Sequence, residues 1–189
     1  MPRVRGGGGF ELGLGCVGVA PLGPDFASVA SRWGVSGTSV ETVRLPRPIA
    51  DAIARHAHEA RPNESCGLVV GSAFAGDGGR ALRYVRCRNA ASSPSRYAIH
   101  RDDLLAVLAE LDRSGGELWG VVHSHVRTPA VPSSTDVGEA AWPAAVYLLV
   151  SLEAEPPRLR AWRIASGAMS ELALEIGDDV LDDIGEAVT

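Results

Sequence analysis

The sequence lacks long apolar runs, a cysteine framework and an excess of positive charge. A membrane-spanning helix needs about 18 or more consecutive apolar residues, and no such run occurs, so no membrane segment is predicted. The three cysteines, Cys16, Cys66 and Cys87, are an odd number at uneven spacing, which argues against a disulfide framework and predicts a reducing, cytoplasmic location. The net charge of −5, without a basic stripe, argues against nucleic acid as the main partner.

The first forty residues differ in composition from the rest of the chain. Positive charges precede a stretch rich in Gly, Val and Leu, as in a signal peptide, but Glu11 and repeated glycines interrupt its apolar core, so secretion is not predicted. Residues 1–40 show neither helix nor strand period and are predicted to be a disordered Gly-rich N-terminal extension, or to precede the true translation start. The domain itself is expected over 41–176, and an acidic C-terminal tail over 177–189.

The remainder of the chain has the pattern of one α/β domain. With 189 residues and 46% hydrophobic content, the chain is long enough to bury a single core, and it contains no internal repeat. Apolar periodicity predicts helices over 45–61, 102–113 and 133–142, and strands over 65–70, 81–88, 96–99, 118–125, 145–152, 159–165 and 171–176. The last two strands are expected to form a hairpin across Ser166 and Gly167.

The most informative feature is His123-Ser124-His125, followed after seven residues by Ser133 and then by Asp136. The apolar residues before His123 predict a buried strand, and residues two apart on a strand share a face. Both imidazoles can therefore reach one ion, whereas Ser124 faces the other side. Two prolines turn the chain before Ser133. Two histidines and one aspartate leave the fourth tetrahedral position of Zn²⁺ to water, which is the arrangement of a catalytic zinc site.

Each part of this motif also has a plainer interpretation. Ser133 followed three residues later by Asp136 is typical of a capping pair at a helix N-terminus, and this is compatible with metal binding. A His-x-His pair alone on a strand is more often two hydrogen-bonded or partly exposed histidines than a metal site. The combination of all these residues at this separation favours a metal centre.

The combined pattern resembles the JAMM (MPN+) zinc metallopeptidases, in which a Glu at the start of an apolar strand precedes the His-x-His, Ser and Asp residues. The segment from Pro62 through Glu64 to Gly71 is similar to the Pro, Glu, Cys-Gly-Leu, Gly segment of the bacterial members. Further similarity to the Mec-type bacterial branch, whose members remove cysteine from a ubiquitin-like sulfur-carrier protein, lies in Asn89–Ile99 with Tyr97, Ala130–Asp136 and Tyr147–Leu152. The resemblance covers roughly residues 43–176.

The resemblance implies a role for each residue of the motif. His123, His125 and Asp136 would bind one Zn²⁺, Glu64 would be the general base, and Ser133 would hydrogen-bond the oxyanion of the tetrahedral intermediate. Amide hydrolysis needs a deprotonated water, a proton carrier to the leaving amine and a donor where negative charge develops. The implied fold is a mixed central β-sheet flanked by helices, the JAMM/MPN fold, which is similar to that of cytidine deaminases.

The resemblance also implies a substrate. This would be the amide bond after the C-terminal Gly-Gly of a ubiquitin-like or sulfur-carrier protein, with release of cysteine in cysteine biosynthesis. The extended tail would add to a sheet edge beside the zinc, and the loops leave little room for insertions that select polyubiquitin linkages. Val126 replaces the proline usual after the second histidine, which predicts an altered loop rather than a lost metal. No nucleic acid or membrane partner is expected, and a homodimer stays open.

Several other residues have structural interpretations. Alone, Glu64 would be a solvated acid in a turn, and only the joint pattern makes it a base. Cys66 should face the same side of its strand as Glu64 and is predicted to be a small buried hydrophobe. His56 and His58 lie in a predicted helix, where residues two apart point about 200° apart, so they are interpreted as surface residues. His100 is predicted to be a hydrogen-bonded residue at a helix boundary.

Three other function classes use related residues. A noncatalytic MPN-type interaction scaffold would have lost part of the motif, whereas all five positions are present. A non-haem iron oxygenase also uses two histidines and one carboxylate, but the accompanying Glu64 and Ser133 favour hydrolysis. A nucleobase deaminase would carry His-x-Glu and Pro-Cys-x-x-Cys, which are absent.

Overall fold

The computed structural model describes residues 41–178 of the chain. The Gly-rich extension expected over 1–40 lies outside the described residues, as does the acidic tail from 179 onward. Within the described part, the elements in chain order are β1 (Thr42–Pro46), α2 (Arg47–Ala60), β2 (Cys66–Gly71), the 3-10 turn η1 (Ala75–Asp77), β3 (Ala81–Cys87), α3 (Arg101–Ser114), β4 (Glu117–His125), α4 (Ser134–Glu139), β5 (Val146–Ser151), β6 (Arg158–Ala165) and β7 (Ala168–Gly177).

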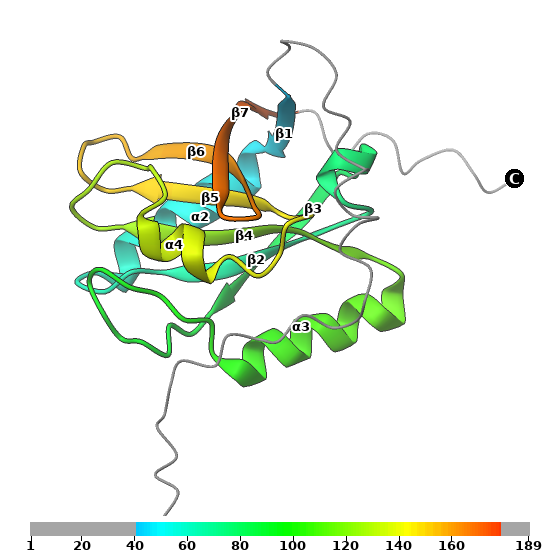
Figure 1. Cartoon of the computed structure of the whole chain (residues 1–189), viewed down its shortest axis with the longest axis horizontal. Helices are drawn as coiled ribbons and strands as arrows, with labels where there is room; N and C mark the ends of the chain where they lie inside the picture. The colour runs from blue at the N-terminus through cyan, green and yellow to red at the C-terminus, as the bar shows by residue number, and fades with distance from the viewer. Residues whose placement is uncertain (1–40, 179–189) are drawn as a thin grey trace, which may run out of the picture.

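The strands form one seven-stranded sheet in the order β1-β7-β6-β5-β4-β2-β3 (Figure 1). The β1/β7 and β4/β5 pairs are parallel and the other pairs are antiparallel. The sheet is therefore mixed, and the predicted α/β class with a central mixed sheet flanked by helices is confirmed. Strand β4 lies between β2 and β5, so its backbone is hydrogen-bonded on both sides, as expected for a strand without exposed edges.

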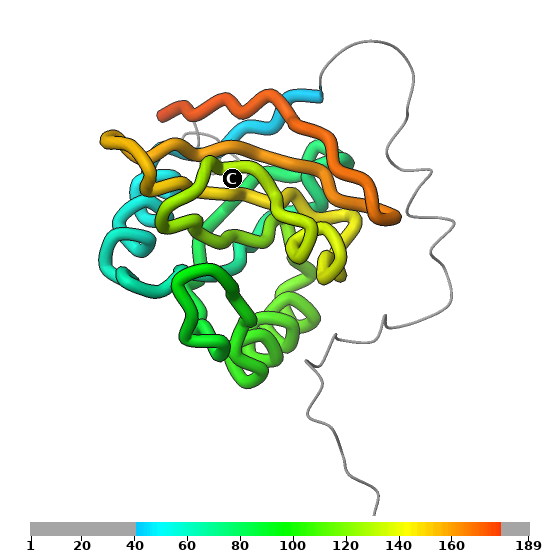
Figure 2. Tube along the Cα trace, turned by 60° about the vertical axis from the view of Figure 1, so that its left-hand side comes forward, coloured from blue at the N-terminus to red at the C-terminus, as the bar shows by residue number. Residues whose placement is uncertain are grey.

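The two long helices cover opposite faces of the sheet, as Figures 1 and 2 show. Because side chains of a strand alternate between faces, neighbouring residues of β2, β4 and β5 belong to different cores. The α2 face buries Ile53, Val69, Val122 and Leu148. The α3 face buries Leu68, Leu104, Val121 and Leu149. His123 follows Val121 by two residues on β4, which places its side chain on the α3 face.

Strand β1 was not expected from the sequence. The predicted helix from residue 45 is wrong at its start, because residues 42–46 pair in parallel with β7 and the helix begins at Arg47. Val43 and Leu45 are buried at alternate positions, as in a strand, but this alternation spans too few residues to be recognised beside the helical pattern that follows. Pro48 fits the first turn of α2, where a missing N–H costs nothing.

Two other elements are shorter than predicted. The strand expected over 96–99 is reduced to a single bridge between Asn89 and Ile99, within a loop. Helix α4 ends at Glu139 rather than at 142, and Ala140 already has extended geometry. The backbone N–H of Trp142 instead donates to the hydroxyl of Tyr147, which stabilises the non-helical path ahead of Pro143.

The hairpin and the second long helix agree with the sequence. β6 and β7 pair antiparallel across Ser166 and Gly167, with Ala165 opposite Ala168. In α3, His100 is the N-cap residue and its Nδ1 accepts from the backbone N–H of Asp102 at 3.3 Å, which confirms it as a hydrogen-bonded boundary residue.

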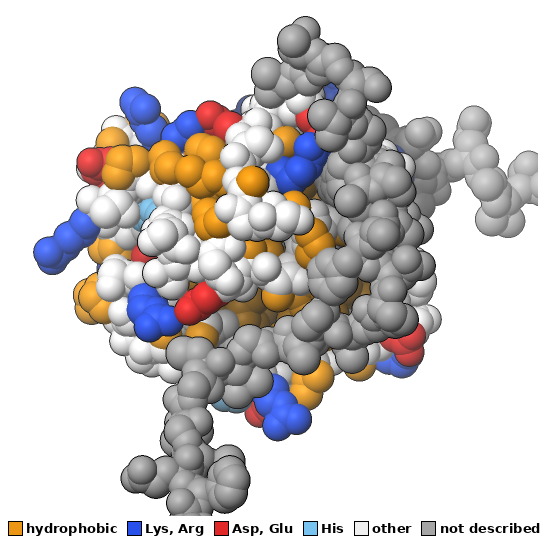
Figure 3. All heavy atoms as spheres, in the orientation of Figure 1, with side chains coloured by type: hydrophobic (Ala, Val, Ile, Leu, Met, Phe, Trp, Pro, Cys, Tyr) orange, Lys and Arg blue, Asp and Glu red, His pale blue; other side chains and the backbone are white. Residues whose placement is uncertain are grey.

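The surface of the described residues is mixed in charge. On the face drawn in Figure 3, arginine and acidic side chains are interspersed around apolar patches, and no broad region of one sign covers the described part of this face. Many arginines of the described chain are paired with acids, for example Arg86 with Glu59 and Arg160 with Glu171. Among the described helices, none is both long and apolar enough to cross a membrane.

Candidate metal centre

Strand β4 brings two histidines to the same face of the sheet. His123 and His125 end this strand and are 0% and 6% exposed. Ser124 between them faces the other side, as predicted, and its Oγ accepts a hydrogen bond from the backbone N–H of Ser65 at 2.8 Å. Because β4 is paired with β2 at His123 and with β5 at both histidines, the ladder fixes both Cβ positions.

The N-terminus of α4 brings the third residue. Ser133 is the N-cap, its Oγ accepts from the backbone N–H of Asp136 at 3.2 Å, and the Asp136 carboxylate accepts from the backbone N–H of Ser133 at 2.7 Å. This reciprocal pair is a capping box, so the capping interpretation of the two residues is confirmed. The Ser133 hydroxyl also donates to Asp136 Oδ2 at 2.7 Å. The capping box thereby orients the carboxylate toward β4.

The three side chains converge on one point. His123 Nε2 lies 3.3 Å from His125 Nε2 and 3.3 Å from Asp136 Oδ1, and His125 Nε2 lies 3.5 Å from Asp136 Oδ2. A tetrahedral ion with bonds of about 2.0–2.1 Å separates its ligand atoms by about 3.3–3.4 Å. The observed spacing therefore fits a tetrahedral metal ion, and His123, His125 and Asp136 form a group able to hold one.

The Nδ1 atoms of the two histidines, which point away from the cluster, differ in their hydrogen bonding. His125 Nδ1 lies 2.7 Å from the carbonyl oxygen of Pro129, and a carbonyl can only accept, so Nδ1 carries the proton and Nε2 is left as the ligand atom. His123 Nδ1 is buried and has no hydrogen-bond partner among the described residues. Instead, the ring of Tyr97 stacks on His123, with centroids 4.2 Å apart and planes 16° from parallel. Packing thus replaces hydrogen bonding in orienting His123.

The protein environment sets the charges of the cluster before any metal binds. Burial lowers the pKa of His123, which favours the neutral ligand form. Burial opposes ionisation of Asp136 as well, but hydrogen bonds from His123, His125 and Ser133 outweigh it and hold the pKa of Asp136 well below its usual range. For His125, burial lowers the pKa, and the hydrogen bonds to Asp136 and Pro129 raise it more. A carboxylate that is ionised beside these imidazoles is ready to bind a cation.

Glu64 lies just before β2, the strand that pairs with the histidine-bearing strand β4. It is 5% exposed, so the solvated acid expected from its sequence context alone is not what the fold produces. Burial raises the pKa of Glu64, the charge of His125 lowers it and the charge of Asp136 raises it, and together they bring it to about 7. A carboxyl group that titrates near neutral pH and interacts with two of the three clustered residues is a suitable proton carrier.

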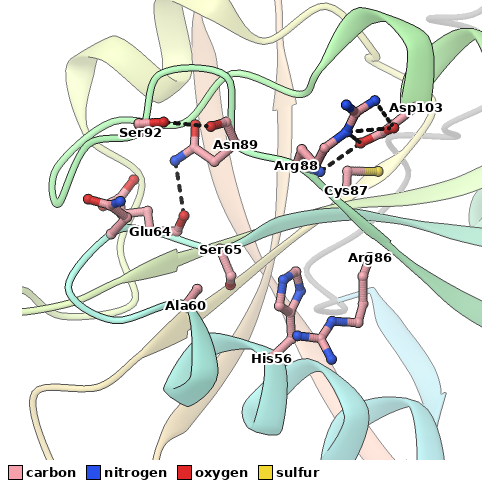
Figure 4. Close-up of a pocket in the computed structure, with 11 residues that line it drawn as sticks. His56, Ala60, Glu64, Ser65, Arg86, Cys87, Arg88, Asn89, Ser92 and Asp103 are labelled. Atoms are coloured by element: carbon pink, nitrogen blue, oxygen red, sulfur yellow. Dashed lines mark hydrogen bonds and ion pairs between the residues drawn. The ribbon is translucent and has the colours of Figure 1, made fainter.

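A cavity of about 560 Å³ adjoins Glu64. Figure 4 shows its lining residues, which come from the end of α2, the segment between α2 and β2, the end of β3, the following loop and the first turn of α3. The arginines of the lining are both paired with acids, Arg86 with Glu59 and Arg88 with Asp103. The Oγ of Ser65 is buried in the lining without a hydrogen-bond partner among the described residues.

The remaining candidates of the sequence lie outside the cluster. Cys66 is fully buried, as predicted, and burial raises its pKa to about 12. The prediction of a surface position is wrong for His56, which is 8% exposed and whose Nδ1 lies 2.8 Å from the hydroxyl of Tyr84. The helical stripe alone could not reveal this, because β3, which carries Tyr84, packs against α2 only in the folded chain.

Two residues of the site were identified only through the family resemblance and without a role. Tyr97 contacts His123 directly, and Asn89 hydrogen-bonds the backbone of Glu64. Both belong to the loop between β3 and α3. No spacing rule predicts a loop residue of this kind, since its position depends on contacts between segments distant in the chain.

The chain is similar in sequence and in structure to known proteins. Residues 46–165 match the model of the prokaryotic homologs of the JAB domain. The chain is 34% identical over 125 residues to the CysO-cysteine peptidase of Mycobacterium tuberculosis, which covers 65% of this chain and 83% of the relative. It is 31% identical over 106 residues to the desampylase of Haloferax volcanii, covering 53% and 74%. A solution structure from Desulfitobacterium hafniense superimposes with a TM-score of 0.65 at 27% identity, covering 72% of this chain and 94% of that protein.

Proposed function

The chain belongs to the family of prokaryotic homologs of the JAB domain, and on this premise we propose that it is a zinc-dependent peptidase acting on a ubiquitin-like or sulfur-carrier protein. The bond cleaved is the amide after the C-terminal Gly-Gly of that carrier. The observation that carries the proposal is the convergence of His123, His125 and Asp136 beside the buried carboxyl group of Glu64. A noncatalytic scaffold would not need this set.

His123, His125 and Asp136 are the residues that would hold one Zn²⁺ per chain. Nitrogen and carboxylate donors of this kind, three in number, are those of catalytic zinc sites. When bound, the ion supplies a Lewis acid for the scissile carbonyl and makes water a nucleophile near neutral pH. The protein's part is to keep His123 neutral through burial and the Asp136 carboxylate ionised through its hydrogen bonds. His125, whose pKa is lowered by burial but raised more by Asp136 and Pro129, would release its Nε2 proton when the ion binds.

Glu64 is the proposed general base. Its carboxylate takes one proton from the attacking water as the new C–O bond forms at the scissile carbonyl. The same proton is then given to the leaving nitrogen as the C–N bond breaks, so Glu64 ends in its starting form. A pKa raised toward 7 by burial is suited to both steps, because a base near the working pH can both accept and return a proton.

Ser133 is the proposed donor to the oxyanion. Its hydroxyl donates to Asp136 Oδ2 in the substrate-free protein, so rotation about Cβ–Oγ is required to turn the proton toward developing negative charge. Both bonds of the capping box survive this rotation, because Oγ stays in place to accept from the backbone N–H of Asp136 and the backbone N–H of Ser133 still donates to the Asp136 carboxylate. A single well-placed donor of this kind is worth about 10²–10³ in kcat.

The names of the relatives and an edge strand of the described sheet support the proposed substrate class. One relative is named as a CysO-cysteine peptidase and two are named as desampylases, so a small carrier protein with a flexible tail is proposed. Of the two edge strands, β3 ends beside Glu64, because Cys87 and Arg88 line the same cavity as Glu64. An extended tail that pairs with β3 would be led toward the general base. We propose cysteine as the leaving group.

The test uses intact-mass analysis of a sulfur-carrier protein that ends in Gly-Gly-Cys, incubated with the zinc-loaded enzyme or with its Glu64→Gln variant. Loss of one cysteine with the wild type alone is the expected result. A second carrier, joined through its Gly-Gly terminus to a lysine side chain, compares a protein leaving group with a free amino acid. Cleavage that requires oxygen, or no cleavage of either carrier by a chain with one bound metal, would overturn the proposal.

A further inference from the structure

Asn89 connects Glu64 to the loop that covers the metal centre. Its Nδ2 donates to the carbonyl oxygens of Glu64 at 2.9 Å and Arg96 at 3.0 Å. Its Oδ1 accepts from the backbone N–H groups of Ala91 and Ala98, both at 3.0 Å. Figure 4 shows the amide lying between the loop and the backbone of Glu64. An amide side chain has two donor hydrogens and two acceptor lone pairs, so the hydrogen-bonding capacity of Asn89 is fully used.

The backbone of Glu64 is held by this loop rather than by the sheet. Glu64 precedes β2, which begins at Cys66. Its N–H donates to the carbonyl oxygen of Ser93 at 2.9 Å, and its own carbonyl accepts from Asn89. Both backbone hydrogen bonds of Glu64 therefore end on residues 89–100, which we call the Asn89 loop. The next residue, Ser65, is bonded to Ser124 of β4 through its N–H and its carbonyl, so the loop bonds hold Glu64 against a fixed neighbour.

The Asn89 loop also contacts the opposite side of the site. Tyr97 stacks on the ring of His123, and the backbone N–H of Ala98, next to Tyr97, is bonded to Asn89 Oδ1. One side chain thus links the position of the carboxyl group of Glu64 to a loop that rests on a metal-ligating histidine.

We propose that Asn89 is a positioning residue, which holds Glu64 at a fixed place relative to the metal-ligating histidines. The inference rests on the proposed peptidase function. Asn89 is not one of the clustered metal-ligating residues, and because its amide is fully used in bonds to backbone groups, it acts through the backbone of Glu64. Removing its amide allows Glu64 to shift, and a displacement of about 1 Å is enough to lower a rate about 100-fold.

The first experiment compares Asn89→Ala with Asn63→Ala. The control removes the same amide group at the position next to Glu64, where it takes no part in these bonds. Asn89→Ala is expected to lower kcat about 10- to 100-fold, with KM and the zinc content unchanged. Asn89→Asp keeps the acceptor for the N–H groups of Ala91 and Ala98 but, when ionised, has no hydrogen to donate to the carbonyl of Glu64. A similar loss of kcat is therefore expected for this variant at alkaline pH, where the new carboxyl group is ionised, even if Asn89→Ala folds poorly.

A double-mutant cycle separates positioning from a general structural effect. If Asn89 acts through Glu64, then Asn89→Ala lowers the residual rate of the Glu64→Gln enzyme by less than twofold. If the loss in that background equals the loss in the wild type, or if Asn89→Ala behaves like Asn63→Ala, the proposal is overturned.

Hydrogen exchange provides a readout that does not depend on activity. Exchange of the backbone amide of Glu64, which donates to Ser93, is expected to rise in Asn89→Ala and to stay unchanged in Asn63→Ala. Unchanged exchange in both variants would contradict the role of Asn89. A wild-type enzyme that cleaves no carrier overturns the proposed function and the positioning role with it. An active wild type with an active Asn89→Ala variant overturns the positioning role alone.

Discussion

The two halves of the candidate site are held in different ways. His123 and His125 lie on β4, whose backbone is paired with β2 on one side and β5 on the other. Glu64 lies ahead of its strand, and its backbone bonds go to Asn89 and Ser93 of a loop. The two histidines, which we call the ligand half, are therefore fixed by a continuous ladder, and Glu64, which we call the base half, by a few bonds to a loop. This difference predicts that changes at Glu64 or its loop can abolish proton transfer without weakening metal binding.

The largest effect is expected for Glu64→Gln. The amide keeps the shape of the side chain but cannot accept the proton of water, so kcat should fall about 10²–10⁴-fold. The metal content should stay at one per chain, because the ligand half is independent of Glu64. Steady-state kinetics and elemental analysis on the same sample check both. Glu110→Gln, which changes an exposed acid paired with Arg83 on the surface, is the matched control and should keep full activity.

Ser133→Ala is expected to have two effects of different size. Loss of the oxyanion donor should lower kcat about 10²–10³-fold, and loss of the N-cap of α4 should cost about 1 kcal/mol of unfolding free energy. Ser134→Ala changes the neighbouring exposed serine. It should leave kcat unchanged and alter the free energy of unfolding by no more than about a few tenths of a kcal/mol. If Ser133→Ala lost stability but kept its rate, the hydroxyl would be a cap and nothing more.

The pH dependence of stability sharpens the contrast at Glu64 itself. In the metal-free protein burial raises the pKa of Glu64 from 4.5 to about 7. Between these values the carboxyl group is ionised when the chain is unfolded but protonated when it is folded, so the wild type loses stability as the pH rises. Relative to Glu64→Gln the loss should reach about 1–3 kcal/mol between about pH 5 and 8. Urea unfolding of both metal-free proteins measures it, and parallel curves would contradict the burial of the ionisable group.

A smaller effect is expected on the α2 face, away from the metal. Tyr84→Phe removes the hydroxyl that lies 2.8 Å from His56 Nδ1, where burial lowers the pKa of His56 to about 4 and keeps the ring neutral. An unpaired buried nitrogen should cost about 1–2 kcal/mol. The denaturation midpoint should fall while kcat stays constant, because His123 and His125 face α3. A reduced kcat would show that the two faces of the sheet are coupled.

The same contrast explains what the sequence could predict. The spacing of His123, His125, Ser133 and Asp136 depends on strand alternation and on helix capping, which are local rules, and the structure brings three of these side chains together within ligand distance with Ser133 bonded to Asp136. Strand β4, helix α3 and the terminal hairpin were likewise predicted from periodicity. Local sequence patterns are sufficient to predict the relative positions of residues that lie on one strand or one helix.

Features that depend on distant segments were missed. Strand β1 is short and pairs with β7 from the other end of the domain, and His56 is buried by its contact with Tyr84 of β3. The bonds of Asn89 depend on a loop whose two ends meet only after folding. Helix and strand periods carry no information on such contacts, so the base half of the site could be inferred from family resemblance but not from spacing.

The proposed activity requires one metal, held by His123, His125 and Asp136, and a Glu64 carboxylate that moves the proton. The direct test is to measure zinc affinity and carrier hydrolysis together for Asp136→Ala and Glu64→Gln. Mutation of the residues that hydrogen-bond metal ligands already lowers metal affinity about 10–100-fold. Loss of the ligand itself in Asp136→Ala should therefore weaken zinc binding about 100-fold or more and abolish hydrolysis, whereas Glu64→Gln should bind zinc as the wild type does and keep only its low residual rate. An Asp136→Ala protein that keeps zinc and cleaves the carrier would contradict this assignment of the metal ligands.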